Sequence, residues 1–309
     1  MAALPPDPSQ YCSILSVQAG EALPGTASQA KTWLLLEYRG IWGSKAFDES
    51  SLPQHVKDHL SQALATLPAA KLQLISHHAR STHTGITFFL GQSRDQEPRL
   101  YEFHLGSYDS LLEMDFSAIL AGARPAVLRA RPLILVCTNG RRDACCARWG
   151  MATYNAIAEA AEKARIHEDA VWQTTHVGGH RLAPNVLSFP AGVYYGRVQP
   201  DEGQTLVEHI IRGEIYLERL RGRSCYTPVV QAAEYYLHQQ TGRLALDAFI
   251  LSEATETSPG EWQIRFLDTQ SGELYQVRLS LKVTSTPIRQ SCGKEKTEPL
   301  VKYELTEIQ

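Results

Sequence analysis

Two short apolar runs separated by an alanine-rich segment constrain the fold of this chain most. Residues 131–137, RPLILVC, and 171–175, VWQTT, are rich in branched and aromatic side chains and predict buried strands. Residues 144–166 lie between them, with apolar side chains three and four positions apart, which predicts a helix that Asp143 can N-cap. A strand, a helix and a second strand of these lengths predict two parallel central strands joined by a helical crossover.

The pattern continues beyond the second strand. The runs VLSFP and GVYYGRV flank Ala191 and Gly192 and predict a hairpin, and a further helix is expected at 203–221. The order β-α-β-β-β-α is typical of a thioredoxin-like domain. We therefore predict an α/β (α+β) fold whose thioredoxin-like domain spans residues 126–225.

Flanking regions on both sides predict two further units. Residues 1–125 form a mixed α/β domain, with a helix at 52–67 and a largely antiparallel sheet of strands at 32–38, 71–77, 85–91 and 100–106. Residues 226–309 form a small C-terminal α/β extension, with a helix at 228–240 and strands at 244–250, 262–267 and 273–283. Residues 252–261 are expected to be a polar connection, and those from Ser285 onward an extended, partly mobile tail. No internal repeat is recognisable.

Composition excludes several classes of protein. The 309 residues carry a net charge of −3 without a clustered basic excess, so no nucleic-acid partner is expected. No apolar run is long enough to span a membrane, and the first ten residues lack the features of a signal peptide. Six cysteines are too few for a disulfide scaffold of this length, so we expect a cytoplasmic protein with reduced or metal-bound thiols.

Four metal-ligating side chains fall at two junctions of the thioredoxin-like domain. Cys137 ends the first strand and Cys146 begins the helix, while His176 and His180 follow the next strand on a loop containing Gly178 and Gly179. Parallel strands bring both junctions to one sheet edge, so the four side chains can converge. The helix N-terminus favours a thiolate at Cys146.

Alternatives to this ligand set remain on residues alone. Taken singly, a cysteine or a histidine is more often a core or surface residue than a ligand. The same four residues suit a zinc-bound structural or regulatory protein, and Cys145 is an alternative to Cys146 as a ligand. A thioredoxin-like thiol oxidoreductase is a further candidate, although no C-x-x-C pair supports it. Cys12 and Cys292 are expected to pack in the core, and His77, His78 and His83 to form a solvated group.

The residues at the two junctions resemble a known family. VCTNGRRDACCARWG at 136–150 and HVGGHRLAPNVLSFPAGVYYGRV at 176–198 are similar to the sucrase/ferredoxin-like family of thioredoxin-like [2Fe–2S] ferredoxins. YCSILSVQAGEALPGTA near the start, TWLLLEYRGIWG at 32–43 and SCGKE near the end look like its bacterial members. The resemblance implies a [2Fe–2S] cluster whose C-x8-C and H-x3-H ligands are Cys137, Cys146, His176 and His180.

Such a cluster implies an electron-transfer protein rather than a catalyst. Two ferric ions, two sulfides, two thiolates and two neutral imidazoles sum to zero charge, so the reduction potential is expected to exceed that of an all-cysteine cluster. Nearby arginines would stabilise the reduced state if they face the cluster; these are Arg141, Arg142, Arg148, Arg181 and Arg197. No nicotinamide or flavin fingerprint is present, so the expected donor is a redox protein or a small reductant.

Overall fold

The middle of the chain folds in the predicted order β-α-β-β-β-α. The structure is a computed structural model that describes residues 11–77, 84–292 and 294–309. The elements of this middle unit are β5 (Leu133–Cys137), α4 (Ala144–Lys163), β6 (Val171–Thr174), β7 (Asn185–Phe189), β8 (Val193–Gly196) and α5 (Gly203–Ile211). The predicted α/β class with a thioredoxin-like order is confirmed.

Burial explains why these segments take these forms. Every residue of β5 and β7 is buried, which matches the unbroken apolar sequence of β5. Helix α4 buries a stripe that includes Tyr154 and Ile157, and Asp143 caps its first turn. Strand β5 pairs in parallel with β6 and antiparallel with β7, and β7 pairs antiparallel with β8. The strand order of the unit is therefore β6-β5-β7-β8.

The N-terminal part repeats this connectivity. Its elements are β1 (Thr32–Glu37), α2 (Gln54–Thr66), β2 (Ala70–Ser76), β3 (Ile86–Gln92), β4 (Arg99–Leu105) and α3 (Phe116–Leu120). Strand β1 pairs in parallel with β2 and antiparallel with β3, and β3 pairs antiparallel with β4. The order β2-β1-β3-β4 matches that of the middle unit strand for strand. The two units therefore share one topology, although no repeat is recognisable in the sequence.

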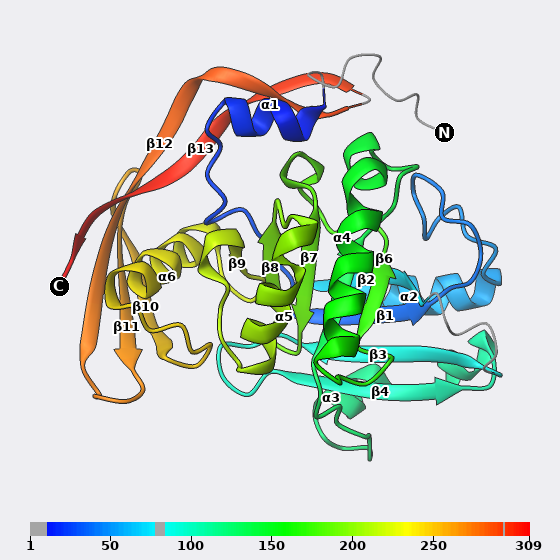
Figure 1. The fold of residues 1–309 in the computed structure, drawn as a ribbon. Helices are drawn as coiled ribbons and strands as arrows, with labels where there is room; N and C mark the ends of the chain where they lie inside the picture. The colour runs from blue at the N-terminus through cyan, green and yellow to red at the C-terminus, as the bar shows by residue number, and fades with distance from the viewer. Residues whose placement is uncertain (1–10, 78–83, 293) are drawn as a thin grey trace.

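The two units share one curved sheet. Strand β2 pairs antiparallel with β6, and β9 (Leu220–Arg223) adds to the outer side of β8, so nine described strands are continuous. Figure 1 shows β3 and β4 running across the direction of β7 and β8. The rings of Trp33 on β1 and Phe189 on β7 meet at 5.2 Å although three strands separate them in the sheet order. The sheet therefore curls around a core that both units build.

The helices cover the convex face of the sheet, on the side away from the core that both units build. Helix α2 and α3 pack on Leu34, Phe88 and neighbouring residues of the N-terminal unit, and α4 and α5 pack on Ile134 and Val136. The concave face holds a separate apolar core. It contains Trp33, Leu35, Phe89, Leu135, Cys137, Trp172, Leu187 and Tyr194 among others. Alternate residues of β1 and β5 thus serve different cores, as the two-residue repeat of a strand requires.

A second, four-stranded antiparallel sheet forms the C-terminal region. Its elements are α6 (Pro228–Thr241), β10 (Phe249–Ser258), β11 (Glu261–Asp268), β12 (Leu274–Ser291) and β13 (Lys294–Ile308). Helix α6 packs Leu237 and Ala233 against Phe266 and Val277 of this sheet. No helix in the described residues is long and apolar enough to cross a membrane. The division at residues 125 and 225 stays a prediction.

Four sequence predictions are wrong in detail. The helix expected at 203–221 ends at Ile211, and β9 follows it. The strand expected at 244–250 begins at Phe249, and the polar connection at 252–261 is largely β10. The tail expected from Ser285 is the end of β12 and all of β13. Most of β10 is exposed on both faces, so it lacks the apolar alternation that predicts a strand.

The tip of the long β12–β13 ribbon lies beside the first described helix of the chain. Figure 1 shows it arching away from the C-terminal sheet to α1 (Cys12–Gln18). At its tip, Cys292 accepts a hydrogen bond from the backbone N–H of Cys12, with 3.4 Å between nitrogen and sulfur. The ribbon thus places residues 280 positions apart next to the start of α4.

Candidate metal centre

Two buried thiols meet where β5 ends and α4 begins. Cys137 is the last residue of β5, Cys146 is the third residue of α4, and each side chain is 1% exposed. Asp143 has extended backbone and accepts the N–H of Cys145 at 2.9 Å, which starts the helix and fixes the direction of Cys146. The Sγ atoms of Cys137 and Cys146 lie 3.5 Å apart, and both cysteines are free.

A glycine-containing loop brings two histidines to the same place. Gly178 and Gly179 have φ values of +99° and +72°, which suit glycine because a Cβ atom is strained there. His176 offers a nitrogen that lies within 4.8 Å of both sulfurs. His180 is outside that group of three, but its ring stacks on the His176 ring with 4.5 Å between centroids. The structure thus gathers all four predicted residues, three of them at ligand spacing.

Neighbouring positions on α4 separate Cys145 from Cys146. Successive helix residues point about 100° apart, so the two side chains face different surroundings. The Cys146 sulfur lies beside Cys137, whereas the Cys145 sulfur lies 3.4 Å from that of Cys12 and 3.3 Å from that of Cys292. The geometry therefore puts Cys146 in the predicted group and Cys145 in a second one, which the sequence analysis missed.

Electrostatics favour one thiolate and a neutral imidazole. The hydrogen bond between the Cys137 and Cys146 sulfurs, together with His176, lowers the pKa of Cys137 well below its usual value. The hydrogen bond with Cys137, followed by burial, raises the pKa of Cys146. Burial lowers the pKa of His180 to about 4, with a smaller contribution from His176. At neutral pH the His180 ring is therefore uncharged and able to ligate a metal.

The residues present fit a metal-containing group. Two thiolates on one tetrahedral ion lie about 3.8 Å apart when metal–sulfur bonds are about 2.3 Å, close to the observed 3.5 Å. The Nδ1 atoms of His176 and His180 are buried and have no hydrogen-bond partner in the described residues. Buried polar atoms without partners are costly, and a metal bond would satisfy them.

Comparison with known proteins places the chain in a family. The sequence profile described as sucrase/ferredoxin-like matches residues 23–222. The chain belongs to the sucrase/ferredoxin-like family. The match spans both thioredoxin-like units and ends within β9.

Individual relatives match only parts of the chain. "Altered inheritance of mitochondria protein 32" of Meyerozyma guilliermondii is 35% identical over 95 residues, which are 29% of this chain and 34% of the relative. The protein of that name from Clavispora lusitaniae is 32% identical over 109 residues, which are 33% of this chain and 40% of the relative. The chain thus spans about two fifths or less of these relatives.

Solved structures are similar over a comparable stretch. The thioredoxin-like [2Fe–2S] ferredoxin from Aquifex aeolicus is 21% identical, with a TM-score of 0.28, and the likeness covers 31% of this chain and 94% of the ferredoxin. A cysteine-to-serine variant of that ferredoxin is 23% identical, with a TM-score of 0.27, over 29% of this chain and 96% of the variant.

A shallow cavity opens beside the histidines of this sucrase/ferredoxin-like protein. It has a volume of about 240 Å³, and Asn139, Arg142 and His176 are among the residues that line it. Both cysteines of the group are almost fully buried, whereas His176 and His180 are partly exposed. The histidine side of the group is therefore the side that meets solvent.

Two of the nearby arginines are held by other partners. Arg181 donates to the Glu21 carboxylate at 2.7 Å, and Arg197 donates to the Ser16 hydroxyl at 2.7 Å. Arg142 lines the cavity that His176 reaches. Among these three, Arg142 is therefore the arginine best placed to act on charge at the histidines.

Replacing Gly179 by alanine tests the loop. A Cβ atom there would lie 2.6 Å from the guanidinium of Arg221, which is 1% exposed and held by Gly178 and Asn185. We expect a loss of about 2–3 kcal/mol in the free energy of unfolding and reduced metal binding. Urea unfolding measures the first effect and metal analysis the second.

Gly20→Ala is the matched control for that substitution. Gly20 has a similar φ of +66°, but a Cβ atom there meets nothing within 4 Å. We expect the backbone strain alone to cost about 1–2 kcal/mol. Equal losses in the two variants, with unchanged metal content, would contradict a role of close packing at Gly179.

The N-terminal unit carries a different set of side chains at the corresponding positions. Glu37 is the last residue of β1 and pairs with Ile75 on β2, and Cys137 is the last residue of β5 and pairs with Thr174 on β6. Glu37 therefore occupies the position in the N-terminal unit that Cys137 occupies in the middle unit. His77 follows Ile75 by two residues, as His176 follows Thr174. The corresponding edge therefore has a carboxylate in place of the thiol.

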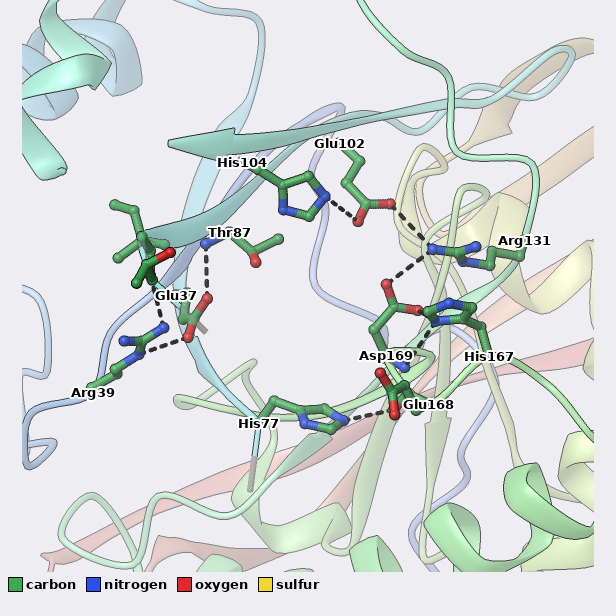
Figure 2. Close-up of a pocket in the computed structure, with 13 residues that line it drawn as sticks. Glu37, Arg39, His77, Thr87, Glu102, His104, Arg131, His167, Glu168 and Asp169 are labelled. Carbon is green, nitrogen blue, oxygen red and sulfur yellow. Dashed lines mark hydrogen bonds and ion pairs between the residues drawn. The ribbon is translucent and has the colours of Figure 1, made fainter. Parts of the chain in front are cut away.

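A polar cavity of about 540 Å³ lies at this edge (Figure 2). Glu37 accepts the backbone N–H of Thr87 at 2.8 Å and pairs with Arg39 at 2.9 Å. On the other wall, Arg131 and His167 pair with Asp169 at 3.0 and 2.7 Å. Glu37 and Asp169 thus each have an arginine partner, and no cysteine is among the described residues that line the cavity, so it does not reproduce the Cys137 site. His78 and His83, predicted as part of a solvated group, lie outside the described residues.

Proposed function

We propose that the protein is a one-electron carrier whose [2Fe–2S] cluster is held by Cys137, Cys146, His176 and His180. The observation that carries the proposal is the pair of buried sulfurs 3.5 Å apart beside two stacked imidazoles whose Nδ1 atoms lack partners. The family's sequence pattern and membership support the choice of cluster. When bound, the cluster would accept and release one electron.

The ligands divide naturally into two pairs. The sulfurs of Cys137 and Cys146 have the spacing of two ligands on one ion, and the histidines would serve the second iron, as in Rieske centres. Two neutral imidazoles leave the oxidised centre without net charge, so adding an electron is easier than with four thiolates. The buried cysteine side excludes water, while the histidine side faces the cavity beside Arg142.

Electron exchange would therefore take place on the histidine side. Both sulfurs are buried, so an electron would travel the shortest distance between the cluster and a partner at the surface through His176 and His180. We propose a redox protein or a small reductant as that partner. The six cysteines are free, which suits a reducing compartment such as the cytoplasm.

Anaerobic purification tests the proposal. We expect a brown protein with visible charge-transfer bands, two irons and two acid-labile sulfides per chain. A zinc site on the same four residues would give a colourless protein without sulfide. A colourless product after reconstitution with iron and sulfide would overturn the proposal.

The reduction potential is expected to depend on pH. A ligand imidazole loses its remaining N–H proton more readily when its iron is ferric, and the lost proton leaves a negative charge that opposes the electron. The potential should therefore fall as pH rises above the pKa of the oxidised form, by up to about 60 mV per pH unit for each coupled proton. Protein-film voltammetry from acid to alkaline pH measures this, and a flat profile would contradict imidazole ligation.

A further inference from the structure

Three cysteines outside the proposed cluster meet at the start of α4. Cys12, Cys145 and Cys292 come from segments 133 and 147 residues apart, yet their sulfurs form a triangle with sides of 3.3, 3.4 and 3.5 Å. None of the three belongs to the set of Cys137, Cys146, His176 and His180. We name these three cysteines with Asp143 the Cys12 group.

Asp143 fixes two of the three segments. One of its oxygens accepts the N–H of Cys145 at 2.9 Å, and the other accepts the N–H of Cys292 at 3.0 Å and the hydroxyl of Ser291 at 2.9 Å. The Cys12 sulfur lies 3.8 Å from the first oxygen. Three sulfurs and one carboxylate oxygen therefore face one another within 4.8 Å.

These distances suit one metal ion. A disulfide needs sulfurs about 2.05 Å apart, and all three cysteines are free. A tetrahedral ion with bonds of about 2.3 Å to sulfur and about 2.1 Å to oxygen has edges of about 3.6–3.8 Å, close to those observed. We propose that the Cys12 group binds a Zn²⁺ ion through the thiolates of Cys12, Cys145 and Cys292, with Asp143 at the fourth corner.

The donor set selects zinc among soft ions. Thiolates alone would also suit Cu(I), but a carboxylate oxygen suits Zn²⁺ better. Backbone N–H groups at the start of α4 and at the ribbon tip point towards this group, and they offset its negative charge. With four protein ligands the coordination is closed, which is typical of structural zinc.

The ion would cross-link three segments that are distant in the sequence. It would link α1 and the tip of the β12–β13 ribbon to Cys145 in the first turn of α4. The residue after Cys145 is Cys146, a ligand of the proposed cluster. The zinc site and the proposed cluster thus use adjacent residues of one helix but different side chains. The inference does not depend on the proposed function.

Metal analysis of paired variants tests the site. In full-length protein purified anaerobically from zinc-supplemented medium, we expect about one zinc per chain. Cys12→Ser and Cys292→Ser should lower the zinc content at least about tenfold, and Cys225→Ser should not, because Cys225 is a free cysteine that belongs to neither group. Iron and visible absorbance should stay unchanged in the first two variants, and His176→Ala should show the reverse pattern.

Each outcome decides between the two sites. Zinc content in Cys12→Ser and Cys292→Ser equal to that of Cys225→Ser would overturn the inference, as would zinc lost only from Cys137 or His176 variants. Zinc that follows Cys12 and Cys292 in a protein without iron–sulfur bands would leave the inference standing while the proposed function fails.

A measurement on the unmodified protein guards against variants that fail to fold. Cys292 is partly exposed, so its alkylation can be followed by mass spectrometry before and after zinc is removed with a chelator. We expect zinc to slow the reaction of Cys292 at least about tenfold and to leave that of Cys225 unchanged. Equal rates for Cys292 with and without zinc would overturn the inference.

Discussion

The Cys137→Ala protein is expected to lose its iron and its visible absorbance almost completely. Alanine has no side-chain atom that can donate to iron, so one of the two thiolate positions would be empty. Cys137 is buried against Cys146, and the nearest other thiol on α4, Cys145, faces the Cys12 group. No third cysteine in the described residues is therefore placed to take over the position.

Iron, sulfide and the visible spectrum measure this result. Cys225→Ala is the control, because Cys225 is free and partly buried but lies near Arg223 and Glu234 rather than in the proposed ligand set. His176→Ala should lose the cluster as well, and its unfolding by urea should show that the fold remains. A Cys137→Ala protein that keeps a stoichiometric cluster would remove this residue from the ligand set.

Arg223→Ala is expected to destabilise the fold by about 3–5 kcal/mol, because it leaves a buried charge without a partner. Arg223 and Glu234 are 1% and 0% exposed, and their charged atoms lie 2.5 Å apart. The same guanidinium donates to Tyr226 at 2.7 Å and contacts Asp95 at 3.2 Å. It thereby joins β9, α6 and the segment after β3.

Two controls separate the buried pair from ordinary surface charge. Arg265→Ala removes an exposed pair with Glu253 at 3.0 Å and should cost less than about 1 kcal/mol. A double Arg223→Met, Glu234→Leu variant should recover much of the stability, because the fully buried Glu234 carboxylate is removed together with its partner. Thermal unfolding measures all three, with a lowering of about 5–15 °C expected for Arg223→Ala. A loss no larger than that of Arg265→Ala would contradict the argument.

Local sequence signals predict the middle unit well. The buried residues of β5, the alanine-rich α4 and its cap at Asp143 each express a preference that the tertiary structure keeps. The C-terminal sheet could not be predicted so well, because β10 exposes both faces and β12–β13 is an extended ribbon that leaves the apolar core. The convergence of Cys12 with Cys292 depends on that ribbon, so no spacing rule in the sequence reveals it.

The repeat of topology escaped the sequence for a related reason. Strands β1 and β5 share an apolar character and an end position, but Glu37 and Cys137 differ in chemistry, and the loops before α2 and α4 differ in length. The residue types therefore show no repeat, whereas the register of β1 with β2 and of β5 with β6 places His77 at the position that corresponds to His176.

The pairing of β2 with β6 governs how this polypeptide can be divided. A fragment that contains only one thioredoxin-like unit would bare a strand edge with unsatisfied N–H and C=O groups, and such edges recruit other chains. It would also uncover Trp33 or Phe189, which shield each other across the sheet. Each unit covers the strand edge and apolar side chains of the other, as subunits do in a dimer. The smallest fragment expected to fold on its own therefore contains both units.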